Sequence, residues 1–115
     1  MEIRNDEHLE TDLRLEGIIA RQRAEEDAAN RIFTDEELGQ AIFSELTRAE
    51  RHGKEFASLH EAYAVMLEEV DEVWDITRMK RRDRSALDLQ KEFIQIAAMA
   101  VKSIKSMRNF IGGNV

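Results

Sequence analysis

The chain has 115 residues and a formal net charge of −7, with 43% hydrophobic and 36% charged residues. It contains neither cysteine nor proline, which excludes disulfides and thiolate metal sites, so a bound metal must take oxygen or imidazole ligands. The negative charge argues against direct binding of nucleic acid, and no stretch reads as a membrane span or a signal peptide. We expect a cytosolic protein with one domain and an arm.

Four helices are predicted along the chain, and no strand pattern is found. The first, roughly residues 7–30, has a thin apolar stripe, so we expect an arm over residues 1–33 that packs on another element or subunit. The second begins at Thr34, which has the spacing of a capping box with Glu37, and Gly53 is a credible stop. Its buried stripe should consist of Leu38, Ile42, Leu46 and Ala49.

The third helix is predicted over residues 58–80 and the fourth over residues 85–109, joined by a short basic connection. Each begins with a serine placed three residues before an acidic residue. Ser58 and Glu61 have the spacing of another capping box, and Ser85 with Asp88 gives a further capping signal. The predicted fold class is therefore all-α, a four-helix bundle whose main domain covers residues 34–115.

The fourth helix carries an almost continuous apolar run. Between Phe93 and Val101 the only polar residue is Gln95. A helix that is apolar on all sides is buried on all sides, and one small domain can hardly cover every face. We therefore expect an oligomer, either a homodimer or a homotetramer.

Two acidic segments, residues 68–72 in the third helix and residues 92–95 in the fourth, are the candidates for chemistry. A carboxylate among apolar neighbours needs a partner, and a divalent cation is the obvious one, although a solvated face is the common alternative. At 100° per residue, Glu68, Glu72 and Asp75 fall within about 40° of Glu61, and Glu69 stands about 80° away, toward the edge of the apolar face.

Together these segments resemble the motif of the MazG-like all-α nucleoside triphosphate pyrophosphohydrolases, which reads E-E-x-x-E, a variable spacer, then E-x-x-D. Residues 68–72 read E-E-V-D-E and match it completely, and the spacer of 19 residues is in the family's range. Residues 92–95 read E-F-I-Q, so Gln95 replaces the final acid. The resemblance covers about residues 56–108, with flanks similar to those of small phage and bacterial members.

The resemblance implies a MazG-like fold and hydrolysis of a nucleoside or deoxynucleoside triphosphate to the monophosphate and pyrophosphate. It implies Mg²⁺, or Mn²⁺ in its place, held by Glu68, Glu69, Glu72 and Glu92, with Gln95 at the last motif position. Glu69 is our candidate for the catalytic residue that positions or deprotonates the attacking water.

Three further side chains, Lys102, Lys105 and His60, are candidates for binding the substrate. Lys102 lies two turns beyond Gln95 on the same side of the fourth helix. Each of the three also fits an ordinary surface or packing position, so both interpretations stay open.

The glutamine at position 95 leaves several alternatives open, because it has no charge and cannot act as a base. Either the site holds one metal fewer, or Asp88 or Asp75 substitutes, or the protein binds a nucleotide without hydrolysing it efficiently. A helical adaptor whose acidic stripe faces a basic partner is a further hypothesis.

Overall fold

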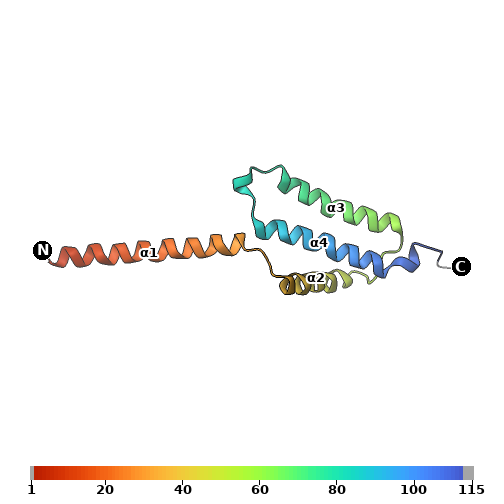
Figure 1. The fold of residues 1–115 in the computed structure, drawn as a ribbon, viewed down its shortest axis with the longest axis horizontal. Coiled ribbons are helices and arrows are strands. Elements are labelled where there is room, and N and C mark those ends of the chain that lie inside the picture. The colour runs from red at the N-terminus through yellow and green to blue at the C-terminus, as the bar shows by residue number, and fades with distance from the viewer. Residues whose placement is uncertain (1, 113–115) are drawn as a thin grey trace. The chain divides into compact units, whose positions relative to one another are not determined.

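A computed structural model describes residues 2–112, with side chains from residue 11 onward. The described residues form helices and no strands, which confirms the predicted all-α class. The chain divides into two units, Met1–Arg31 and Ile32–Val115 (Figure 1). Residues 1 and 113–115, at the outer ends of the two predicted ranges 1–33 and 34–115, lie outside the described residues.

The first unit is a single helix, α1 (Glu2–Asn30). Its described side chains are almost all exposed, and Leu13, Leu15 and Ile18 are 58%, 51% and 45% exposed. About 160° of helix rotation separates Leu13 from Leu15, so the aliphatic residues do not share one face. Because these residues lie on different faces of α1, the sequence shows only a thin apolar stripe.

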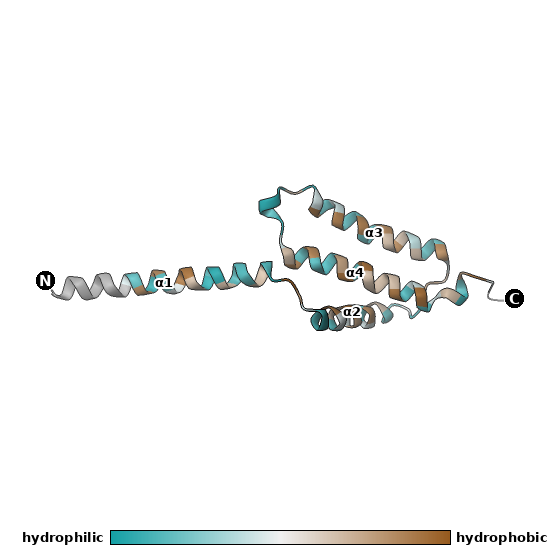
Figure 2. Ribbon diagram, in the orientation of Figure 1, coloured by the Kyte–Doolittle hydropathy of each residue, from teal (hydrophilic) through white to brown (hydrophobic). Residues whose placement is uncertain are grey.

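The second unit has three α-helices, α2 (Asp35–Glu50), α3 (Leu59–Thr77) and α4 (Ala86–Lys105), with two short 3₁₀ helices, η1 (Arg81–Asp83) and η2 (Met107–Asn109). Within it, α4 packs against both α2 and α3 (Figure 1). Hydrophobic residues are frequent along all three helices (Figure 2). Because α4 has a neighbour on two sides, most of its apolar run is covered within the chain. Among the described residues, none of the helices has the length and apolar character needed to cross a bilayer.

The helix starts follow the predicted capping residues. Thr34 Oγ1 accepts a hydrogen bond from the amide of Glu37 at 3.2 Å, and the Glu37 carboxylate accepts one from the amide of Thr34 at 3.0 Å. Ser58 accepts from the amide of Glu61 at 3.1 Å, and α4 is capped in the same way. The Glu61 carboxylate bonds the amide of Ala57, not that of Ser58, so the predicted box at Ser58 is only half formed.

The hydrophobic core of the second unit is small and centres on α4. Ala98 on α4 is fully buried, and Ala62 on α3 is 2% exposed. Small residues at a helix contact let the two backbones approach closely. The other members of the buried cluster are Leu46, Phe56 and Met99. Of the predicted stripe on α2, Leu46 is buried and the other three residues are half-buried.

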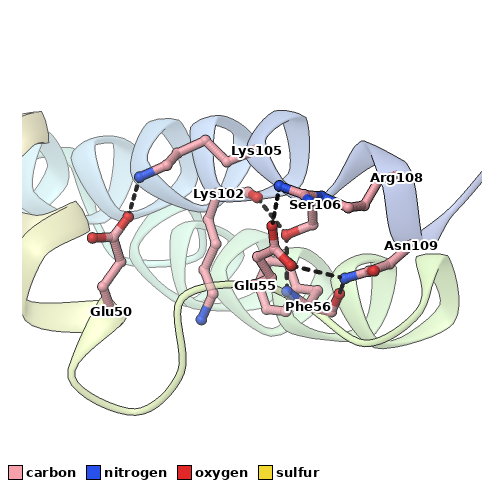
Figure 3. Close-up of polar contacts among 8 residues, drawn as sticks. All are labelled: Glu50, Glu55, Phe56, Lys102, Lys105, Ser106, Arg108 and Asn109. Carbon is pink, nitrogen blue, oxygen red and sulfur yellow. Dashed lines mark hydrogen bonds and ion pairs between the residues drawn. The ribbon is translucent and has the colours of Figure 1, made fainter. Parts of the chain in front are cut away.

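A polar network fastens the segment between α2 and α3 to the end of α4 (Figure 3). The buried hydroxyl of Ser106 accepts from the amide of Phe56 at 2.8 Å and donates to the carbonyl of Lys102 at 2.7 Å. Asn109 donates to the carbonyl of Phe56 at 2.8 Å. These bonds hold the start of α3, and therefore its register, against α4.

Candidate metal centre

Two acidic residues of α3 lie in the row of residues that faces α4. Glu69 and Glu72 follow Ala62 and Val65, both part of the core packing, at intervals of three or four residues, so all four share one side of the helix. At 100° per residue Tyr63 falls on the apolar side of this helix, opposite Glu61, so the sequence predicts a buried position for it. Tyr63 is in fact 67% exposed, because Ala62 makes the closer contact.

Three carboxylates converge between α3 and α4. Glu69 and Glu72 from α3 and Glu92 from α4 each place a carboxylate oxygen within 4.8 Å of the others. Glu69 and Glu92 are half-buried and Glu72 is exposed. Glu72 is within hydrogen-bonding reach of each of the other two. The two motif segments, which are 19 residues apart in the sequence, therefore meet in space.

The crowding of these groups changes their protonation. Burial, followed by the negative charge of Glu72, raises the pKa of Glu69 from 4.5 to about 7. A hydrogen bond to Glu72, followed by burial, raises the pKa of Glu92 to about 7. Both groups hold a proton more tightly than a free carboxyl group, because burial and the neighbouring Glu72 both disfavour a further negative charge there. A cation at this place would relieve the same repulsion.

Gln95, at the last position of the motif, contacts two of the three carboxylates. Oriented to satisfy its hydrogen bonds, its amide nitrogen donates to Oε2 of Glu69 at 2.6 Å and to Oε2 of Glu92 at 3.1 Å. An amide donor stabilises the charged form of both neighbours. Rotation of the amide would turn its oxygen toward the same place, where it could coordinate a hard cation.

The donor set fits a hard divalent cation. Mg²⁺ is bound in proteins by one or two carboxylates together with water and phosphate oxygens, and Glu69, Glu72 and Glu92 supply three carboxylates from two helices. The chain has no cysteine, so the softer metals that thiolates select are disfavoured.

The remaining acidic candidates lie around this cluster. Glu68 is exposed and is outside the three-carboxylate group that the described residues form, although its charge adds to the rise in the pKa of Glu69. Asp88 acts in the same way on Glu92. Asp75 forms an ion pair with Arg78 at 2.6 Å, so its carboxylate already has a cationic partner.

The three candidates for substrate binding lie farther away. Lys102 is ten residues beyond Glu92 on α4, about 15 Å along the helix axis. It is 7% exposed, and its Nζ lies 4.5 Å from the centre of the Phe56 ring. Lys105 forms an ion pair with Glu50 (Figure 3). The exposed His60, in the first turn of α3, lies about 13 Å along the axis from Glu69. The structure does not bring these three side chains to the carboxylates.

Sequence reasoning missed one charged pair beside the cluster, Glu45 and Arg48 on α2. Nε and Nη2 of Arg48 donate to the two carboxylate oxygens of Glu45 at 3.2 and 2.7 Å. Glu45, and more weakly Glu69, raises the pKa of Arg48. The spacing i, i+3 is common on exposed helices, so the sequence gives no signal that this pair lies next to Glu69.

Comparison of the chain with protein-family models, with curated proteins and with solved structures finds no match. The geometry of the three carboxylates and the motif resemblance are therefore the basis for a functional proposal.

Proposed function

We propose that the protein is a magnesium-dependent pyrophosphohydrolase with a MazG-like helical fold. It would convert a nucleoside or deoxynucleoside triphosphate to the monophosphate and pyrophosphate. The observation that supports this most is the convergence of Glu69, Glu72 and Glu92, which come from both segments of the motif, within 4.8 Å of one another. Charges this close are unfavourable in a folded protein, which is understandable if they serve a cation.

Each residue of the cluster would have its own role in this reaction. Glu69, Glu72 and Glu92 hold the cation, which when bound neutralises the polyphosphate and activates a water molecule. Glu69, a half-buried carboxylate of the cluster, would accept a proton from the water that attacks the α-phosphorus. Gln95, which donates to Glu69 and Glu92, keeps both carboxylates oriented.

We also propose that the protein is an oligomer, a homodimer or a homotetramer. Large apolar side chains form a row along one side of α3, spaced three or four residues apart and 44–67% exposed. The row consists of Leu59, Tyr63, Leu67, Val70 and Trp74. Contiguous apolar patches on a protein surface mark interaction sites, and a second copy of the chain would cover this one.

A second candidate function is nucleotide binding without hydrolysis, and Gln95 favours it. The amide supplies no negative charge and no base where the family motif has an acid. If this candidate is correct, the purified protein binds a triphosphate with Mg²⁺ and returns it unchanged after long incubation at high protein concentration.

The test is to incubate the protein with Mg²⁺ and a panel of ribo- and deoxyribonucleoside triphosphates and to separate the products by chromatography. We expect a monophosphate and pyrophosphate from at least one substrate, and no product from Glu72→Gln. The matched control is Asp71→Asn, which removes the same charge from the exposed neighbouring position and should retain activity. Equal activity in the two variants would contradict the assignment of the site.

A further inference from the structure

In the ion pair between Glu45 and Arg48, the carboxylate is partly buried and the guanidinium is accessible. The Arg48 side chain is 64% exposed, whereas that of Glu45 is 20% exposed. A guanidinium has five N–H donors, and the two bonds to Glu45 use only two of them. Arg48 is therefore held at one edge while its other donors remain available to a ligand.

Two cavities meet at this pair. One, of about 480 Å³, lies between α2 and α4 and has Gln95 in its lining, and the other, of about 260 Å³, has Glu69 in its lining. Glu45 and Arg48 line both cavities, and among the described residues no other cationic side chain does so. The guanidinium thus borders both the smaller cavity, which Glu69 of the cluster lines, and the larger cavity, which Gln95 lines.

We infer that Arg48 binds phosphate oxygens of the ligand at the carboxylate cluster, and that Glu45 positions its guanidinium for this contact. The inference rests on the proposed function and adds the substrate contact that the two motif segments lack. A polyphosphate carries more negative charge than one divalent cation neutralises, and a planar guanidinium matches two phosphate oxygens at once. Lys102 and Lys105, the cations expected from the sequence, lie about 15 and 20 Å along α4 from Glu92.

The lining of the larger cavity indicates where the rest of such a ligand lies. Phe33, Ala41 and Ile94 contribute apolar surface there, next to Arg48 and Gln95. A flat, uncharged group joined to a polyphosphate, such as a nucleobase, fits that combination of apolar walls and a cationic edge.

The test measures cation binding and phosphate binding separately. Mn²⁺ binding is followed by electron paramagnetic resonance, and binding of inorganic pyrophosphate to the Mn²⁺-loaded protein is followed by calorimetry. The variants are Arg48→Ala, Arg48→Lys and Glu45→Gln, and the control is Arg51→Ala, an exposed arginine at the end of the same helix. Thermal unfolding checks that each variant is folded.

We expect Arg48→Ala to bind Mn²⁺ like the wild type and to bind pyrophosphate about tenfold or more weakly. Arg48→Lys and Glu45→Gln should give intermediate losses, and Arg51→Ala none. Unchanged pyrophosphate binding in folded Arg48→Ala would overturn the inference and leave the metal centre intact. A wild-type protein that binds no Mn²⁺ would overturn the proposed function, and the inference with it.

Discussion

The amide nitrogen of Gln95 on α4 donates a hydrogen bond to Oε2 of Glu69 on α3 at 2.6 Å. This bond crosses the helix interface at the point where the motif resemblance would place an acid. A neutral donor there offsets the repulsion among the carboxylates, whereas an acid would add to it. Gln95 therefore stabilises an arrangement of carboxylates that an acid at the same position would destabilise.

This relationship predicts the effect of Gln95→Glu. Without divalent cations the variant should lose about 1–3 kcal/mol of stability, because two carboxylates lose a donor and gain a repelling charge. Saturating Mg²⁺ should stabilise it more than it stabilises the wild type. Thermal unfolding with chelator and with Mg²⁺ checks this, and Gln40→Glu adds the same charge at an exposed position of α2. Equal responses of the two variants would contradict the account.

The stability of the metal-free protein should depend on pH. The pKa values of Glu69 and Glu92 in the folded chain, about 7, lie above the ordinary value of 4.5. The folded state therefore binds protons more tightly than the unfolded state, and this stabilisation is complete below about pH 4.5 and is lost as the pH rises through about 7. Urea unfolding in chelator between about pH 5 and pH 8 measures the effect.

The control for this pH dependence is the double variant Glu69→Gln/Glu92→Gln. It lacks both titrating groups, so its stability should fall less than that of the wild type over the same range. Parallel pH profiles for the two proteins would show that these carboxyl groups do not titrate as described.

The apolar row on α3 predicts how the oligomer can be broken. Leu67, in the middle of the row, is 44% exposed, and in Leu67→Glu a charge would be buried against a second copy. We expect the wild type to have the mass of a dimer or tetramer by light scattering, and Leu67→Glu to shift to the monomer. A monomeric wild type, or equal dissociation of the Gln40→Glu variant, would contradict the proposal that this row forms the contact between copies of the chain.

Removal of the buried hydroxyl of Ser106 should lower the stability of the fold. In Ser106→Ala the amide of Phe56 loses its acceptor at 2.8 Å, and a buried donor without a partner costs about 1–3 kcal/mol. Ser103→Ala is the matched control, because the Ser103 hydroxyl donates to the carbonyl of Met99 within the same helix. Urea unfolding should show a clearly larger loss for Ser106→Ala. Equal losses would mean that the bond between Phe56 and Ser106 does not stabilise the segment between α2 and α3.

The sequence predicts the helices of the second unit better than it predicts their faces. Capping at Thr34 and Ser58 depends on local spacing, so the helix starts could be read directly. The inward face of α3 could not, because apolar residues occupy most of its circumference. The contact of Ala62 with α4 decides that face, and it turns Tyr63 toward the surface.

The candidate site was also predicted only in part. The motif identifies Glu69, Glu72 and Glu92, and the structure brings these three together. It could not show that Glu68 lies outside the group that these three carboxylates form, since adjacent residues differ by 100° around a helix. The contribution of Arg48 depends on the packing of α2 beside α4, which no local pattern encodes.

The most direct test of the proposed reaction is the fate of ¹⁸O when the protein hydrolyses a triphosphate in labelled water with Mg²⁺. Attack at the α-phosphorus predicts one labelled oxygen in the monophosphate and none in the pyrophosphate, as mass spectrometry of the products would show. Label in pyrophosphate, release of inorganic phosphate, or no product from any nucleotide would contradict the account.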